Sequence, residues 1–416
     1  MPISRRQFVS SSIAASSALL SAPALPARTE SPFVRVHKKD LIAPSGEKIM
    51  LRGINLGNWL EPEGYMFLFE GGPQSPREIE GFVNELIGPS AAKDFWTAYR
   101  QNYITKSDIE FIRSSGLNSV RIPLHYKFFL SSDEGFHLVD PVIEWCRAAG
   151  IWVVLDLHCA PGGQTGTNID DSWGYPWLYE SPADQAATVE VWKRIAQHYR
   201  DQSTVLGYDL LNEPYPQYPG LPKYNDRLAS IYRQIIAGIR EVDQDHIVIL
   251  GGARWDQDFS LFDSKFDRKL MYTFHTYWTP PTEESIRNFL DFRDDNNAPM
   301  WLGESGENTD DWIQQFVKVL EHNHIGWCFW PYKKMEKTSC MVSIRQPQFW
   351  DEVLALAAMP GGTGSAAQRI AKRPSLDHSR HALQSLLENV RFENCRVNAG
   401  YIQALGGAVP ARNPKP

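Results

Sequence analysis

Two glutamates follow apolar, strand-like segments in this 416-residue chain, and paired carboxyl groups of this kind can cleave glycosidic bonds. Glu213 stands in Leu-Leu-Asn-Glu-Pro, and Glu304 stands in Met-Trp-Leu-Gly-Glu-Ser. One carboxylic acid would protonate the leaving oxygen of a sugar, and the other would attack the anomeric carbon. An acid catalyst must keep its proton near neutral pH, so we expect the Glu304 carboxylate and burial to raise the pKa of Glu213. Arg121 and Tyr277 are the expected partners that keep Glu304 ionised.

The rest of the chain has a pattern that can position such a pair. Short apolar segments alternate with longer amphipathic ones, which predicts parallel strands joined by crossover helices. We expect helices at residues 107–115, 141–149 (with Pro141 in the first turn), 183–200, 224–241, 283–295 and 310–323. The predicted strands are residues 49–55, 119–123, 151–158, 205–212, 246–251, 270–277, 300–304 and 325–330. Eight such strands predict an α/β fold of the (β/α)8 TIM barrel type.

Polar and aromatic residues gather where these strands are expected to end, which is where barrel enzymes build their sites. Asn212 is a candidate donor to a sugar 2-hydroxyl, His158 and His275 could bind hydroxyls or orient the carboxyl groups, and Trp330 could form a floor for the reacting sugar. Taken singly, each histidine could instead be structural, and the tryptophan could be ordinary core. The whole set of strand-end candidates is Arg121, His158, Asn212, Glu213, His275, Tyr277, Glu304 and Trp330.

Two long, aromatic-rich segments, residues 56–103 and 161–182, are expected to be βα loops that wall off a cleft. The barrel is expected to span residues 33–358. Gly-Gly-Thr-Gly-Ser at 361–365 indicates a flexible break, followed by a helix at 376–390 and a compact tail at 392–405. So short a segment cannot bury a core of its own. We therefore expect residues 359–407 to be a C-terminal helical appendage packed on the barrel, and residues 408–416 to be disordered.

Residues 1–27 resemble a bacterial twin-arginine export signal. Arg5 and Arg6 precede an apolar, Ala/Ser-rich stretch with small residues at candidate cleavage sites. A periplasmic or secreted location is expected, and the alternative is an accidental arginine pair before a Sec-type signal. The twin-arginine route exports proteins already folded in a reducing cytosol, so the five cysteines are poor evidence for a disulfide framework.

Several other classes of protein are not expected. The formal charge is −7 without a basic stripe, which argues against nucleic acid, and no apolar run reaches the roughly 18 residues of a membrane span. His125, His158 and His275 could converge near Asp156, but no metal-binding motif is present, so no metal is expected. Ser305 lies in no nucleophile elbow, and the glycine-rich segment at 160–163 lacks the lysine of a phosphate loop. We expect no cofactor, and a monomer by default.

Taken in order, the motifs resemble glycoside hydrolase family 5, a family of retaining (β/α)8 glycosidases, over residues 35–358. The resemblance implies that Glu213 is the acid/base and Glu304 the nucleophile, and that the remaining strand-end candidates occupy active-site positions. It rests on Arg-Gly-Ile-Asn-Leu-Gly (52–57), Val-Arg-Ile-Pro (120–123), Asp-Leu-His (156–158), Leu-Asn-Glu-Pro (211–214), Phe-His-Thr-Tyr (274–277), Gly-Glu (303–304) and Phe-Trp (329–330).

Within that family, residues 55–62 and 160–166 resemble the fungal exo-β-1,3-glucanase branch. In that branch an acidic residue after the first strand binds the terminal glucose and closes one end of the cleft. Glu61 is expected to do this here, with Glu63 as the alternative. Three departures leave the linkage and the exo or endo mode open: Gly57-Asn58 in place of Gly-Gly, Ser305 in place of Phe, and Pro331 after the tryptophan.

The sequence therefore predicts an exported, retaining β-glycosidase that hydrolyses β-glucosidic bonds in a β-glucan or β-glucoside, acting from the chain end. An endo-acting β-1,4-glucanase (cellulase) or a mannanase is the alternative among enzymes, and transfer to a sugar acceptor stays open. A catalytically dead carbohydrate-binding barrel is the alternative outside enzymes, but binding alone needs no paired acids.

Overall fold

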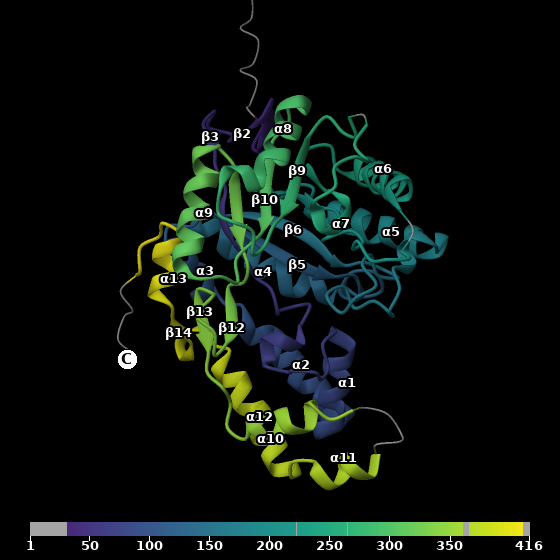
Figure 1. Ribbon diagram of the computed structural model, residues 1–416, viewed down its shortest axis with the longest axis vertical. Coiled ribbons are helices and arrows are strands. Elements are labelled where there is room, and N and C mark those ends of the chain that lie inside the picture. Colours follow the sequence, from purple (N-terminus) through teal and green to yellow (C-terminus); the bar gives the residue numbers. More distant parts are fainter. Residues whose placement is uncertain (1–30, 222, 264, 361–365, 411–416) are drawn as a thin grey trace, which may run out of the picture. The chain divides into compact units, whose positions relative to one another are not determined.

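The computed structural model describes residues 31–221, 223–263, 265–360 and 366–410. Within them, eight parallel strands close into a barrel in the order β10-β11-β4-β5-β6-β7-β8-β9, which confirms the predicted (β/α)8 architecture (Figure 1). These strands are almost entirely buried, as expected for a parallel sheet that is covered on both faces. They are β4 (Arg52–Asn55), β5 (Ser119–His125), β6 (Trp152–Cys159), β7 (Val205–Asp209), β8 (Ile247–Gly251), β9 (Leu270–His275), β10 (Met300–Glu304) and β11 (Gly326–Phe329).

Crossover helices cover the barrel at the predicted places, with one boundary wrong. Helix α4 begins at Glu134, so Pro141 lies inside the helix rather than in its first turn. Pro141 is exposed, whereas Phe136, Val139 and Val142 are buried on the other face, and this packing carries the helix through the proline. The crossover helices are α3 (Lys106–Ser114), α4 (Glu134–Ala149), α5 (Pro182–Tyr199), α6 (Asn225–Val242), α8 (Arg287–Asn296) and α9 (Asp310–His322).

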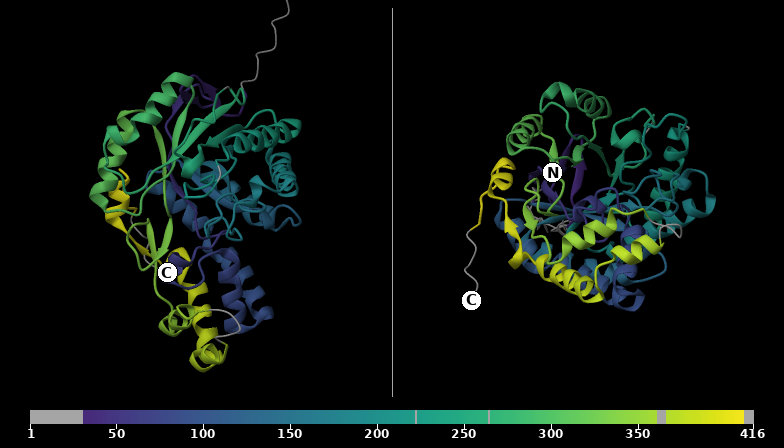
Figure 2. Two further views of the ribbon diagram at one scale, coloured as in Figure 1. Left: turned by 45° about the vertical axis from the view of Figure 1, so that its right-hand side comes forward. Right: turned by 60° about the horizontal axis from the view of Figure 1, so that its bottom comes forward.

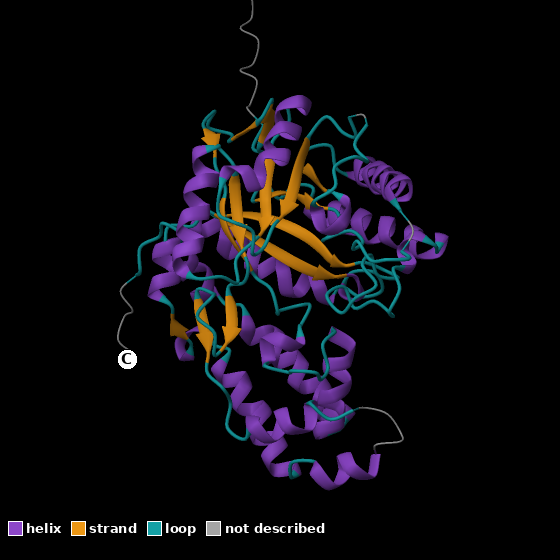
Figure 3. Ribbon diagram, in the orientation of Figure 1, coloured by secondary structure: helices purple, strands orange, loops and turns teal. Residues whose placement is uncertain are grey.

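The segment 56–103 is not the open loop that the sequence predicted, because it contains helices α1 (Pro76–Ile87) and α2 (Pro89–Tyr103) (Figure 3). Ser75 and Glu78 form a reciprocal capping box at the start of α1, and each helix begins with proline. The segment 161–182 remains a largely irregular loop, as predicted.

Three short antiparallel strands, β1 (Arg35–His37), β2 (Asp40–Ile42) and β3 (Lys48–Ile49), lie at the N-terminal end of the barrel. Their segment contributes Val34 and Leu41 to an apolar cluster with Met271 and Trp301, which fills the barrel at that end. The opposite end of the barrel is left for the polar side chains.

The C-terminal segment packs on elements that follow the barrel strands. Helix α12 (Leu376–Asn389), the predicted helix at 376–390, contacts α1 and α2, and α13 (Ala399–Ala404) contacts α9 (Figure 2). Strand β14 (Arg396–Val397) completes a small sheet with β12 (Lys333–Met335) and β13 (Val342–Ile344). Helices α10 (Trp350–Ala357) and α11 (Ala366–Lys372) connect these parts.

The proposed export signal, the glycine-rich break at 361–365 and residues 411–416 lie outside the described residues. Across the described part of the chain, no helix combines the length and the apolar character that crossing a membrane requires.

Lys333 joins the barrel, the long βα segment and the C-terminal segment at one buried point. Its ammonium group lies 2.6 Å from Asp108 Oδ1 and donates to the backbone carbonyls of Tyr103 at 2.5 Å and Val390 at 2.8 Å. Both charged side chains are fully buried. Removing one partner would leave the other as an unpaired buried charge, which is the costly way to disrupt such a pair.

We predict that Lys333→Met lowers the free energy of unfolding by about 3–5 kcal/mol, because Asp108 loses its counter-charge and two carbonyls lose a donor. Urea titration monitored by tryptophan fluorescence would measure the change. Lys337→Met, on an exposed residue of the same segment, serves as the control and should change stability little. Equal effects of the two substitutions would contradict this role of Lys333.

Candidate active site

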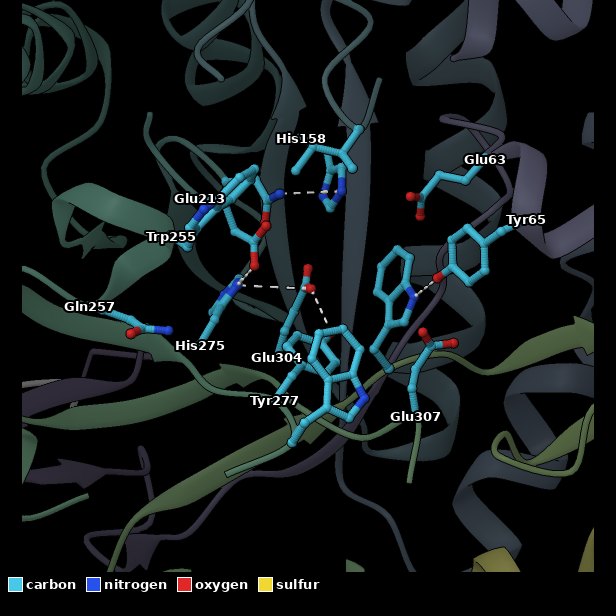
Figure 4. Close-up of a pocket in the computed structure, with 14 residues that line it drawn as sticks. Glu63, Tyr65, His158, Glu213, Trp255, Gln257, His275, Tyr277, Glu304 and Glu307 are labelled. Atoms are coloured by element: carbon cyan, nitrogen blue, oxygen red, sulfur yellow. Dashed lines mark hydrogen bonds and ion pairs between the residues drawn. The ribbon is translucent and has the colours of Figure 1, made fainter. Parts of the chain in front are cut away.

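A pocket of about 500 Å³ opens at the C-terminal ends of the barrel strands (Figure 4). Strand β7 ends at Asp209 and β9 at His275, so Asn212, Glu213 and Tyr277 lie in the loops just beyond these strands rather than on them. Seven of the predicted site residues line the pocket together: His158, Asn212, Glu213, His275, Tyr277, Glu304 and Trp330.

Glu304 is held by the two partners that the sequence predicted. Its Oε1 accepts from Arg121 Nη1 at 2.5 Å, and its Oε2 accepts from the Tyr277 hydroxyl at 2.9 Å. The carboxyl group is 94% buried by side-chain area, since only 6% of it is exposed. A guanidinium and a hydroxyl therefore each donate to one oxygen of this carboxyl group.

Arg121, another of the strand-end candidates, does not line the pocket. It is the third residue of β5, its side chain is fully buried, and it points to the barrel interior beneath Glu304. There it also meets Asp156 at 3.0 Å and Asp209 at 2.9 Å. Burial raises the pKa of both aspartates to about 7, against the opposing effect of Arg121. The guanidinium of Arg121 thus forms ion pairs with three carboxyl groups in the barrel interior.

Glu213 is held as a carboxylic acid mainly by burial. Burial raises its pKa to about 7, while His158 and Arg121 act in the opposite direction. The expected repulsion from Glu304 is therefore not the principal cause. Its Oε1 lies 3.1 Å from His275 Nδ1, and its backbone adopts a left-handed conformation with φ of 45°. Such strain in a non-glycine residue persists only where surrounding contacts impose it.

His158 connects the buried carboxylates to the pocket surface. Its Nδ1 lies 2.8 Å from Asp156 Oδ2, and its Nε2 lies 3.3 Å from Asn212 Nδ2. Asn212 Oδ1 accepts from Arg121, so its Nδ2 is the donor to Nε2 and the ring proton is assigned to Nδ1. Burial lowers the pKa of His158 to about 4, which keeps the ring neutral.

Trp330 forms one wall of the pocket. Its indole stacks on His158 with ring centroids 5.6 Å apart, and its Nε1 donates to the Tyr65 hydroxyl at 2.8 Å. A side chain at Gly57 would come within 2.2 Å of the indole, which explains the glycine at that position. The Trp330–Pro331 peptide bond is cis.

The acidic residue that faces the pocket after the first strand is Glu63, the alternative, and not Glu61. Glu61 is fully buried, its Oε1 accepts from the backbone of Asn58, and it does not line the pocket. Glu63 lines it instead, with its carboxyl group opposite Glu213 (Figure 4). Burial, Glu304 and Glu307 raise the pKa of Glu63 well above its usual value. The left-handed backbone of Asn58, with φ of 64°, changes the direction of the chain and so decides which glutamate faces inward.

Other lining residues were not predicted from the sequence. Glu307 stands three positions after the nucleophile candidate and pairs with Lys334, and Trp278 follows Tyr277 directly and is 70% exposed. Closeness to a strand-end motif could have suggested both of them. The remaining ones, from three other segments, are Tyr65, Ile169, Trp255 and Gln257.

His125, His158 and His275, which were considered as possible metal ligands, do not form a group with metal-like spacing among the described residues. Among the described residues, the cluster with metal-like spacing is Glu213, His275 and Glu304, whose nearest ligand-type atoms lie within 4.8 Å of one another. The hydrogen bonds among these side chains and to Arg121 and Tyr277 explain this spacing, and we assign no ion to it.

Comparisons with known proteins identify the family and the fold of the chain. The sequence profile of cellulase (glycosyl hydrolase family 5) matches residues 80–336, which is more than half of the chain. A β-xylosidase of Phanerodontia chrysosporium is 28% identical over 351 residues, covering 72% of this chain and 71% of that protein. A probable glucan 1,3-β-glucosidase A of Aspergillus clavatus is 30% identical over 225 residues, covering 52% of each. A rutinosidase structure from Aspergillus niger shares the fold with a TM-score of 0.59 and 18% identity, covering 70% of this chain and 92% of that one.

We predict that the carboxyl group of Glu213 titrates near pH 7, because burial disfavours its charged form. NMR of protein labelled with 13C at the glutamate side-chain carboxyl carbon would show one resonance moving through its midpoint near neutral pH. Glu213→Gln should remove that resonance and assign it. A Glu213 resonance that titrates near pH 4.5 would contradict the buried-acid description.

Proposed function

The chain belongs to glycosyl hydrolase family 5, and we propose that it is a retaining β-glycosidase that removes single sugars from the ends of β-glucosides or β-glucans. One observation carries the proposal. Glu213, kept protonated by burial, and Glu304, bonded to Arg121 and Tyr277, have carboxyl oxygens within 4.8 Å of each other. Retaining enzymes need such closeness, whereas inverting enzymes place the two carboxyl groups roughly 6.5–9.5 Å apart to admit water.

The two carboxyl groups would act in sequence. Glu304 attacks the anomeric carbon while Glu213 gives its proton to the departing oxygen, and a glycosyl ester on Glu304 results. Glu213, now a carboxylate, then takes a proton from the water that attacks the ester, and sugar and enzyme are released. The Tyr277 hydroxyl and Arg121 stabilise the Glu304 carboxylate before attack and after release.

The acidic wall of the pocket supports release of single sugars. Glu63 faces Glu213 from the side of the first strand, with Tyr65 and Glu307 beside it. Because Glu63 is held largely as a neutral carboxyl group, it can donate to one sugar hydroxyl and accept from another. The two relatives whose names specify a β-xylosidase and a glucan 1,3-β-glucosidase favour a neutral β-glycoside as substrate.

We further propose export through the twin-arginine motif at Arg5 and Arg6, which would place the enzyme where extracellular glycosides are found. This route fits a barrel that buries all five cysteines without a disulfide, since it moves proteins after they have folded.

The double displacement is tested by the response of two variants to the leaving group. Glu304→Gln should lose activity on every β-glucoside, because no nucleophile remains. Glu213→Gln should lose about 10²–10⁴-fold on methyl β-glucoside but much less in the first step with a dinitrophenyl leaving group, which departs without a proton. The exposed Glu284→Gln is the matched control. Proton NMR of the first product should show the β-anomer, and an α-anomer would refute retention.

The mode of action is tested by product analysis. We expect the mature protein to release glucose alone from laminarin, β-1,6-glucan or short gluco-oligosaccharides, with an aryl β-xyloside, carboxymethylcellulose and mannan in the same panel. Glu63→Ala should lower kcat/KM by roughly 10–100-fold through lost sugar contacts, and Glu70→Ala, on an exposed glutamate, should not. A ladder of oligosaccharides from the outset would mean an endo-acting enzyme and would reject a closed pocket at Glu63.

A further inference from the structure

A buried aspartate behind the pocket has contacts that the reaction scheme does not yet use. Asp256 ends the short segment α7 (Ala253–Asp256), where Arg254, Trp255 and Asp256 all adopt left-handed backbone with φ between 56° and 62°. The Asp256 side chain is fully buried, and a side chain at Gly251 would come within 1.7 Å of its Oδ1. Three strained residues and a required glycine thus hold one carboxyl group in place.

Asp256 touches both partners of the acid/base pair. Its Oδ2 accepts from the backbone N–H of Glu213 at 3.1 Å and lies 3.4 Å from Nε2 of His275. On the other side of the same ring, Nδ1 lies 3.1 Å from Glu213 Oε1 and 3.8 Å from Glu304 Oε2. His275 therefore bridges the buried carboxyl group and the two reacting ones.

The neighbours of the ring decide where its proton lies. Nδ1 faces Glu304 Oε2, which accepts from Tyr277 and Nδ1 alike, and Glu213 Oε1, which can accept when the Glu213 proton lies on Oε2, so an N–H at Nδ1 suits both neighbours. Burial lowers the pKa of His275 to about 3, so the ring is neutral and carries that one proton only. Nε2 then presents a lone pair, and among the described residues it has no hydrogen-bond partner of standard geometry.

A lone pair on Nε2 requires a donor from the Asp256 side. If Asp256 were a carboxylate, two lone pairs would face each other across 3.4 Å in a buried space. Burial raises the pKa of Asp256 well above its usual value, Asp209 and Glu213 raise it further, and Arg121 lowers it. The charged or titratable groups near Asp256 are Asp209, Glu213, His275, Arg121, Tyr179 and Tyr232.

We propose that Asp256 is a positioning residue that keeps a proton on its carboxyl group, donates it to Nε2 of His275 and so fixes the Nδ1–H tautomer toward Glu213. This inference rests on the proposed role of Glu213 as acid/base.

The tautomer determines which oxygen of Glu213 holds the catalytic proton. With Nδ1–H donating to Oε1, the proton of Glu213 must lie on Oε2, the oxygen left for the departing group. The opposite tautomer would make Nδ1 an acceptor and draw the Glu213 proton onto Oε1. During a cycle, Oε2 gives its proton to the leaving oxygen and regains one from water, while His275 and Asp256 keep theirs.

Nitrogen NMR of protein labelled with 15N-histidine tests the assignment without any substrate. The ring nitrogens of His275, identified by loss of their signals in His275→Ala, should show a protonated Nδ1 and an unprotonated Nε2 near pH 6. The reverse pattern would overturn the proposal. Because no turnover is involved, failure here is distinct from failure of the proposed glycosidase activity.

Two substitutions of similar size distinguish the hydrogen-bond donor that Asp256 supplies from the volume that its side chain fills. Asp256→Asn keeps a donor to Nε2 when its Nδ2 takes the place of Oδ2, at the cost of the acceptor for the Glu213 backbone N–H, so it should retain the tautomer with a partial loss of kcat. Asp256→Leu should switch His275 to Nε2–H and lower kcat by roughly 10–100-fold. It should also move the basic limb of the kcat/KM profile to higher pH, because Nδ1 then accepts from protonated Glu213 and stabilises that form. Loss of activity in both variants with an unchanged tautomer and pH profile would mean a merely structural role.

Discussion

The buried guanidinium of Arg121 is the interaction on which the site depends. It reaches Asp156, Asp209 and Glu304 at 2.5–3.0 Å from the interior of the barrel, where its side chain is fully buried. One cation cannot neutralise three carboxylates, so protons must make up the difference. Glu304 has Tyr277 as a second donor on the pocket side, and this extra bond favours the ionised form at the position where a nucleophile is needed.

The site buries more carboxyl groups than cations, so some of the other carboxyl groups keep their protons. Burial raises the pKa of Glu213 to about 7, and two buried aspartates each contact a histidine whose pKa burial lowers. Asp156 accepts the Nδ1 proton of His158, and its pKa is raised only to about 7 with Arg121 as a neighbour. Asp256, whose pKa burial raises well above its usual value, donates to His275 in our proposal instead of accepting from it. The two Asp–His contacts therefore differ in the direction of the hydrogen bond, because Asp156 forms an ion pair with Arg121 and Asp256 does not.

The barrel, and the meeting of Glu213 and Glu304 in one pocket, could be predicted because they depend on short-range patterns. Strand periodicity placed eight strands, and polar residues just after apolar runs must meet at one end of a parallel barrel. Glu61 and Glu63 could not be separated this way, because a left-handed turn at Asn58 decides which one faces inward. Asp256 had no signal either, since left-handed backbone at Arg254 and Trp255 follows from tertiary contacts rather than from glycine. The helices of residues 76–103 were missed although a capping box at Ser75 was legible in the sequence.

The C-terminal segment bears on the pocket as well as on stability, because strand β12 connects the two. Successive residues of a strand point to opposite faces, and Lys333 turns to Val390 of the C-terminal segment while Lys334 turns to the pocket. Lys334 pairs with Glu307 and lies 4.4 Å from the ring centroid of Tyr65, the residue that bonds the Trp330 indole. The contacts that hold Lys333 therefore also hold Lys334 in place, and Lys334 in turn holds Glu307 in the pocket wall opposite Glu213. A segment far from the reacting carboxyl groups in sequence thus shapes the end of the pocket that a terminal sugar would fill.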